Sequence, residues 1–89
     1  MIITKTVVIK NKKGIHARVA AKIVSVTNRY DADVFFSKGD KEINGKSLLD
    51  ILTLSCSHGG SIVIKISGND ASEMMNELEL LIDDKFGED

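Results

Sequence analysis

The alternation of hydrophobic and polar residues along the chain predicts a succession of short strands and helices. Residues 3–10 are rich in β-branched residues and end in the polar, glycine-closed turn 11–14, so they predict a first strand. From His16 onward the period becomes helical, and one buried stripe is formed by Val19, Ile23, Val26 and Tyr30. A second face of this helix carries Arg18, Ala21, Lys22, Ser25 and Asn28.

The middle of the chain predicts a hairpin followed by a short helix. Residues 32–36 are expected to form a strand, residues 37–40 a turn, and residues 41–43 a short returning strand. Ser47 is an N-cap candidate for a helix over 48–54, with Asp50 three residues later. This segment is too apolar for a short helix that hides only one face, so we expect some of its leucine side chains to be exposed.

The last third predicts one further strand, over residues 62–66, after a turn at 58–61. Asn69-Asp70 is expected to cap a final helix that ends at Gly87, with a buried stripe of Ala71, Met74, Met75, Leu78, Leu81 and Ile82. The order βαββαβα, with short turns and a hairpin, favours an α+β fold over a doubly wound sheet. We expect a two-layer open-faced sandwich, an antiparallel sheet with helices on one face, in a single domain over 1–89.

Composition narrows the classes of function. The chain has 89 residues, of which 43% are hydrophobic, and a mean hydropathy of zero, which is ordinary for a soluble globular protein. Its single cysteine, Cys56, excludes an intrachain disulfide, and Cys56 with His58 gives too few ligands for a zinc site. No apolar run approaches the roughly 18 residues of a membrane helix. Without an export signal, a cytoplasmic protein is expected, with no metal and no cofactor.

Charge is distributed unevenly along the chain. Residues 1–30 carry seven basic residues and no acid, whereas residues 69–89 hold eight acids and one lysine. A basic segment that also contains a histidine suits an acidic protein partner, through electrostatic steering. Nucleic acid is an alternative partner, which would bind Lys10, Lys12, Lys13 and Arg18, but no aromatic stacking motif for RNA is visible.

The candidate site is Gly14-Ile15-His16-Ala17-Arg18, at the point where the first helical pattern begins. The first backbone N–H groups of a helix have no carbonyl partner and carry the positive end of its dipole, so an anion is favoured there. That location favours the neutral, nucleophilic imidazole of His16. A phosphate on the ring would meet the amides of Ala17 and Arg18 and the Arg18 guanidinium. The alternative is a polar N-cap histidine followed by a solvated arginine.

Two motifs resemble the histidine-containing phosphocarrier (HPr) family of the bacterial phosphoenolpyruvate-dependent phosphotransferase system: residues 14–18 and Ile43-Asn44-Gly45-Lys46-Ser47. The resemblance implies four strands and three helices, phosphorylation of His16 on Nδ1 by Enzyme I, transfer to a IIA-type protein, and contact between Arg18 and the phosphate. It also implies a monomeric carrier rather than an enzyme with its own turnover. The chain departs from the family at Val19, where a proline usually follows the arginine, and valine adds one backbone donor.

The resemblance further implies regulation at Ser47, which in many family members is phosphorylated by an HPr kinase/phosphorylase. Asp50 replaces the small residue common there, and its charge would repel a phosphate on Ser47. Partners are expected to dock on the first helix and on the surplus leucines, that is on His16, Arg18, Ala21, Lys22, Ser25, Leu48, Leu49 and Leu52. Two roles stay open: sugar uptake, or regulation by phosphorylation-dependent protein binding, as in nitrogen-type HPr paralogues.

Overall fold

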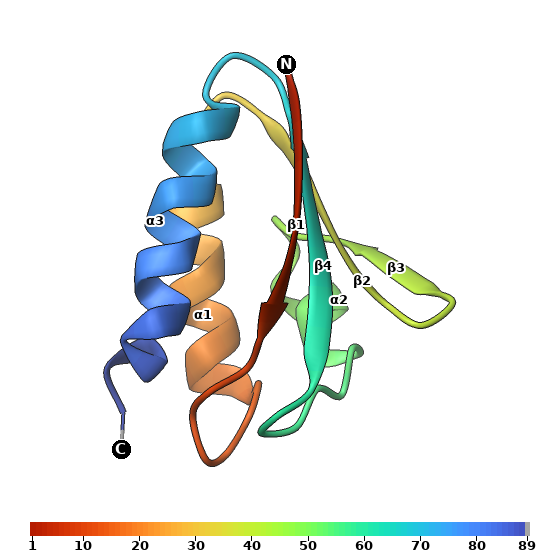
Figure 1. Ribbon diagram of the computed structural model, residues 1–89, viewed down its shortest axis with the longest axis vertical. Helices are drawn as coiled ribbons and strands as arrows, with labels where there is room; N and C mark the ends of the chain where they lie inside the picture. Colours follow the sequence, from red (N-terminus) through yellow and green to blue (C-terminus); the bar gives the residue numbers. More distant parts are fainter. Residues whose placement is uncertain (89) are drawn as a thin grey trace.

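Four strands form one antiparallel sheet in the order β1-β4-β2-β3 in the computed structural model, which describes residues 1–88 (Figure 1). The strands are β1 (Ile2–Val8), β2 (Asp33–Lys38), β3 (Lys41–Asn44) and β4 (Ser61–Ser67). Strand β4 is central, because Ile66 lies opposite Ile3 of β1 and also opposite Val34 of β2. The segment predicted to form the last strand therefore joins β1 to the hairpin of β2 and β3 in one sheet.

Three α-helices cover one face of this sheet: α1 (Ala17–Thr27), α2 (Leu48–Leu52) and α3 (Ala71–Asp83) (Figure 1). A short 3-10 helix, η1 (Lys85–Gly87), follows α3. The other face of the sheet is open, and it exposes side chains such as Ile2, Val8 and Phe35. The expected α+β open-faced sandwich is confirmed. Over residues 1–88, no helix combines the length and the apolar character needed to cross a membrane.

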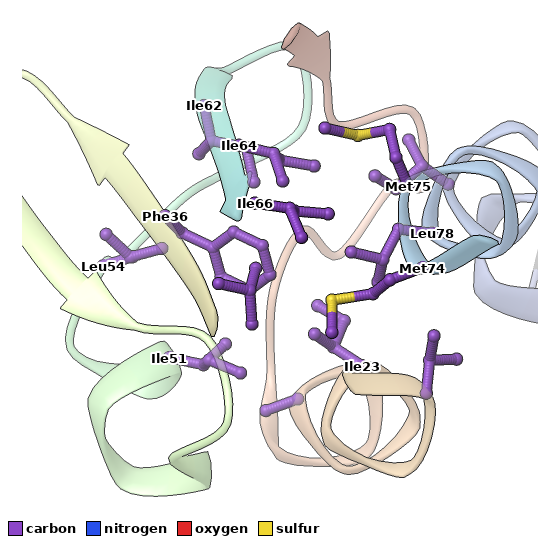
Figure 2. Close-up of a cluster of buried hydrophobic side chains, with 14 of the residues drawn as sticks. Ile23, Phe36, Ile51, Leu54, Ile62, Ile64, Ile66, Met74, Met75 and Leu78 are labelled. Atoms are coloured by element: carbon purple, nitrogen blue, oxygen red, sulfur yellow. The ribbon is translucent and has the colours of Figure 1, made fainter. Parts of the chain in front are cut away.

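The core lies between the sheet and the helices. Alternate side chains of β4 point to the same face of the sheet, and Ile62, Ile64 and Ile66 are all buried there. Figure 2 shows them in one cluster with Met74, Met75 and Leu78 of α3. Burial of each such side chain stabilises the fold by about 1.5–3 kcal/mol. The predicted stripes of α1 and α3 are confirmed, except that Tyr30 and Leu81 are only partly buried.

Boundaries differ from the prediction at the hairpin. We expected a turn over residues 37–40, but β2 continues to Lys38 and β3 begins at Lys41, which leaves only Gly39-Asp40 between the strands. Gly39 has a φ of 60°, the left-handed conformation that tight two-residue hairpins require. Ser37 and Lys38 are therefore free to pair with Glu42 and Lys41.

Boundaries also differ at the first strand and the second helix. Strand β1 ends at Val8 rather than at Lys10, because Ile9 leaves the ladder and is fully buried. The N–H group of Ile9 donates to the Gly60 carbonyl at 2.9 Å. Helix α2 ends at Leu52 rather than at Leu54, and the Thr53 hydroxyl donates to the Asp50 carbonyl at 2.6 Å.

Of the two predicted helix caps after the hairpin, one is confirmed and one is wrong. The Ser47 hydroxyl accepts the Asp50 N–H at 3.2 Å, as expected for an N-cap. Asp70 occupies the N-cap position of α3 but makes no capping hydrogen bond. Its carboxylate instead accepts the backbone N–H of Asp31 at 2.7 Å, a long-range partner that no local pattern indicates. The sequence therefore predicted where α3 begins but not what Asp70 binds.

The fold brings the basic and acidic parts of the chain together. Helix α3 packs on β1 and α1, and it pairs Glu79 with Lys5 at 2.8 Å and Asp83 with Lys10 at 2.7 Å. Because both pairs are solvent-exposed, each adds little to stability. They do neutralise part of the positive charge of the basic segment. One of the paired residues, Lys10, is among those expected to contact nucleic acid if that were the partner.

Candidate functional site

Gly14 fixes the point at which α1 begins. It has a φ of 68°, and a Cβ atom there would lie 2.5 Å from the Cys56 carbonyl oxygen and 2.9 Å from Ser57 Cα. The next N–H group, of Ile15, donates to the Cys56 carbonyl at 2.9 Å. The loop before the helix is thus pressed against residues 56–57, and only glycine fits at this position.

His16 is the N-cap of α1, as predicted. Its backbone is extended, its carbonyl accepts the Ala20 N–H at 2.8 Å, and its Nδ1 accepts the Arg18 N–H at 3.3 Å. The ring is partly exposed, with 29% of the side chain accessible. A nitrogen that accepts an N–H must keep its lone pair, so the contact with Arg18 assigns the ring proton to Nε2.

Glu88 is the site residue that the sequence analysis missed. Both of its carboxylate oxygens lie 3.0 Å from His16 Nε2, and Oε2 lies 3.8 Å from Arg18 Nη1. A carboxylate only accepts hydrogen bonds, so this contact independently places the ring proton on Nε2. The lone pair of Nδ1 is left facing the start of α1.

The hydrogen bond from His16, followed by a second one from Asn11, holds the pKa of Glu88 below its usual 4.5. Glu88 is therefore ionised at neutral pH. Because its folded-state pKa is depressed, the stability that it contributes is present above about pH 4.5 and is lost as the pH falls through the lowered pKa.

Asn11 connects the loop to the carboxylate, and sequence analysis missed it too. It is fully buried, and its Nδ2 donates to the Gly14 carbonyl at 2.7 Å and to Glu88 Oε1 at 2.8 Å. These two acceptors fix the orientation of the amide. Its Oδ1 has no hydrogen-bond partner in the part of the chain that the structure describes. Asparagine is common in turns, so its residue type gave no signal of this role.

The segment after α3 delivers Glu88 to the histidine. Phe86 is fully buried, and Lys85, Phe86 and Gly87 all have positive φ values, of 54°, 56° and 73°, which reverse the chain at the end of the helix. Lys22 of α1 donates to the Phe86 carbonyl. The reversal explains why a residue 72 positions away from His16 contacts its ring.

The predicted docking residues lie on α1 and α2, which pack against each other. On α1, Ala21 and Ser25 are exposed, and the Arg18 side chain is 69% accessible. On α2, Leu49 is 73% exposed and Leu48 is 36% exposed, so the expectation of exposed leucines is met. Leu52 is partly buried against the core, and Lys22 is held by the tail.

The two other residues considered for chemistry lie apart from this arrangement. Cys56 is buried, and that burial raises the pKa of its thiol, which keeps it in the unreactive form. His58 is exposed in a turn, as predicted. Within residues 1–88, no three His, Cys, Asp or Glu side chains are grouped closely enough to hold a metal ion.

The surroundings of His16 are open and carry both signs of charge. A hollow of about 150 Å³ is lined by Lys12 and Lys13 together with Arg18 and Glu88, the two residues that flank the site. Cationic side chains and a helix start favour an anion, and the adjacent carboxylate limits how tightly an anion is held. The arrangement is therefore suited to a nucleophilic imidazole that carries an anionic group on Nδ1 and releases it again.

Comparison with known proteins connects this geometry to described families. A family model described as "PTS HPr component phosphorylation site" matches residues 3–84. The chain is 33% identical over 82 residues to the phosphocarrier protein HPr of Xylella fastidiosa, covering 92% of each chain. It is 34% identical over 82 residues to the HPr-like protein Crh of Halalkalibacterium halodurans, covering 92% of this chain and 98% of that protein.

A solved structure shows the same similarity in three dimensions. The crystal structure of HPr-C-His from Thermoanaerobacter tengcongensis superimposes with a TM-score of 0.93 at 36% sequence identity. The match covers 98% of each chain. The similarity therefore extends over the sheet, the helices and the segment that follows α3.

Proposed function

Because this chain belongs to the HPr family of phosphocarrier proteins, we propose that it accepts a phosphoryl group from Enzyme I on His16 and passes it to a IIA-type protein. One observation carries the proposal: Nδ1 of His16 accepts the Arg18 N–H at the start of α1, while Nε2 faces the Glu88 carboxylate. In this role the chain is a monomeric cytoplasmic carrier that has no turnover of its own.

For the first transfer the protein has to position the His16 ring and to supply positive charge near the incoming phosphate. The lone pair of His16 Nδ1 attacks the phosphorus, an N–P bond forms, and the donor keeps the electron pair of the bond that breaks. The new phosphate would lie at the amides of Ala17 and Arg18, where the helix dipole favours negative charge. The exposed Arg18 guanidinium is free to turn toward it and donate two hydrogen bonds.

The second transfer requires that the phosphate is not held too tightly. An interaction that stabilises the phosphorylated carrier more than the transition state slows the onward step. An exposed arginine and a ring with 29% accessibility make a shallow site, in which a partner's side chains can replace the contacts of the carrier. The geometry suits a relay better than a deep pocket would.

A direct experiment tests the proposal. The chain is incubated with phosphoenolpyruvate and Enzyme I from the same cell, and the modified residue is located by mass spectrometry under alkaline conditions. We expect one acid-labile phosphate, on His16. The absence of any phosphate, or a phosphate on another residue, would overturn the proposal.

Partner docking is proposed to use the exposed leucines of α2 together with α1. We expect Leu49→Asp to weaken binding to Enzyme I by at least about tenfold, because a charge would have to be desolvated at an apolar contact. The matched control is Leu80→Asp on α3, where the leucine is equally exposed, at 70% against 73% for Leu49. Isothermal calorimetry on both variants measures the change. Equal affinities would remove Leu49 from the docking surface.

Regulation is proposed to act at Ser47, where a negative charge would lie beside the same leucines. We expect Ser47→Asp to slow phosphorylation of His16 by Enzyme I while the fold is kept, because aspartate is as good an N-cap as serine. Ser47→Ala is the matched control, since it removes the cap, at a cost of about 1 kcal/mol, but adds no charge. Transfer rates and melting curves separate the two effects. A rate unchanged by Ser47→Asp would leave Ser47 as a cap alone.

A purely regulatory role, as in nitrogen-type HPr paralogues, is the second candidate, and the exposed leucines also support it. The two roles differ in what the phosphorylated form binds. Pull-downs that compare the two phosphoforms would recover a sugar-specific IIA protein in the first case, and only regulatory partners in the second.

A further inference from the structure

We propose that Glu88 is a positioning residue for His16: its carboxylate holds the ring proton on Nε2 and balances the positive charge that develops on the imidazole when Nδ1 is phosphorylated. This inference rests on the proposed function of His16. It adds a residue from the segment after α3 to a site that the sequence places entirely at the start of α1.

The contact is built rather than incidental. Both Glu88 oxygens lie 3.0 Å from Nε2, and only 15% of the Glu88 side chain is accessible. The carboxylate is fixed from the other side by Asn11, which is itself fully buried. Phe86, also fully buried, anchors the segment two residues earlier. Glu88 is therefore held at the ring by two buried neighbours.

The charge balance of the transfer explains what the carboxylate does. The form of the ring that reacts has its proton on Nε2 and a lone pair on Nδ1. When that pair forms the N–P bond, the donor, a phosphorylated protein side chain, leaves with the electrons of its own bond. The Nε2 proton stays in place, so positive charge develops on the ring directly opposite Glu88. The carboxylate already makes this hydrogen bond charge-assisted, and the positive charge on the ring adds a direct attraction between opposite charges.

The same contact supports the onward transfer. A ring that keeps its Nε2 proton leaves as a neutral imidazole when the N–P bond breaks, so no proton has to be supplied at that moment. Arg18 remains available to the phosphate, because its Nη1 lies 3.8 Å from Glu88 Oε2, too far for a hydrogen bond, and its side chain is 69% accessible. Glu88 can therefore act on the ring while Arg18 acts on the phosphate.

The first test uses the unphosphorylated protein and does not depend on transfer. Nitrogen-15 NMR of the His16 ring reports which nitrogen carries the proton, and the full chain is used throughout. We expect a protonated Nε2 with a slowly exchanging N–H signal in the wild type and in Glu88→Gln, because glutamine still offers an oxygen acceptor. In Glu88→Ala that signal should be lost to exchange with water. A wild-type proton on Nδ1, or an identical signal in Glu88→Ala, would overturn the inference.

The second test isolates the charge. We expect Glu88→Gln to slow phosphoryl transfer to and from His16 by about tenfold although the tautomer is kept, because only the charge is removed. Asp84→Asn is the matched control, since it removes the same charge from an exposed position on the same segment. Equal rates for Glu88→Gln and the wild type, or an equal loss for Asp84→Asn, would overturn the role of the charge. If neither the wild type nor any variant is phosphorylated on His16, the proposed function fails. The NMR result would still show whether Glu88 holds the ring proton on Nε2.

Discussion

Replacing His16 by alanine should abolish phosphorylation of the chain, whereas His58→Ala should leave it unchanged. His16 alone combines a helix start, a lone pair on Nδ1 and a neighbouring arginine, and His58 is exposed in a turn with none of these. No other described side chain near the site offers a neutral nitrogen nucleophile, so we expect no residual transfer. The measurement is incorporation of labelled phosphate from phosphoenolpyruvate through Enzyme I.

A cap-preserving variant keeps this result interpretable. His16→Ala removes an N-cap as well as a nucleophile, which costs about 1 kcal/mol of stability. His16→Asn keeps a capping side chain but has no nucleophilic ring nitrogen. It should fold like the wild type and take no phosphate. Labelling that persists in His16→Asn, or that disappears in His58→Ala, would move the site away from His16.

The parts of the fold that the sequence predicted are those with a local, repeated signal. Val19, Ile23 and Val26 recur with the helical period because one face of α1 is buried, and the pattern exists whatever that face packs on. The N-caps His16 and Ser47 were predicted for the same reason, since a cap bonds an amide two or three residues away.

The parts that the sequence did not predict depend on partners far along the chain. Asp70 looks like a cap, but the Asp31 amide competes for its carboxylate, and only the fold brings the two together. The same holds for Asn11 and Glu88, which are 77 positions apart and share a hydrogen bond. Local patterns carry no information on such pairs, so neither Asn11 nor Glu88 could be assigned to the site from the sequence.

Charge illustrates the same limit. The contrast between a basic start and an acidic end was visible in the sequence, and it indicated a basic docking face. The structure shows that the two ends meet, since Lys5 and Lys10 pair with α3 and Glu88 lies at the histidine. A charge pattern along a chain therefore predicts a surface only when the folded neighbours are known.

Phe86 anchors the segment that carries Glu88, and its replacement is expected to have a large effect on stability. Phe86→Ala should lower the free energy of unfolding by about 3–5 kcal/mol, because a fully buried aromatic side chain is removed and a cavity is left. That is a large share of the roughly 5–15 kcal/mol that stabilises a typical domain. Urea denaturation of the wild type and the variant measures the loss. A change below about 1 kcal/mol would mean that the segment is not packed as described.

Phe86→Leu separates packing from the effect on the site, because it keeps most of the apolar volume and should leave the domain folded. If Phe86 holds Glu88 at the ring, the NMR signal of the His16 Nε2 proton should be weaker in Phe86→Leu than in the wild type. Its loss should follow the fall in the free energy of unfolding that this variant causes. The control is Leu80→Ala, where the leucine is 70% exposed. This variant should change the free energy of unfolding by no more than about 0.5 kcal/mol and should leave the ring signal unchanged. A ring signal unchanged in a destabilised Phe86→Leu protein would show that Asn11 alone suffices to hold the carboxylate.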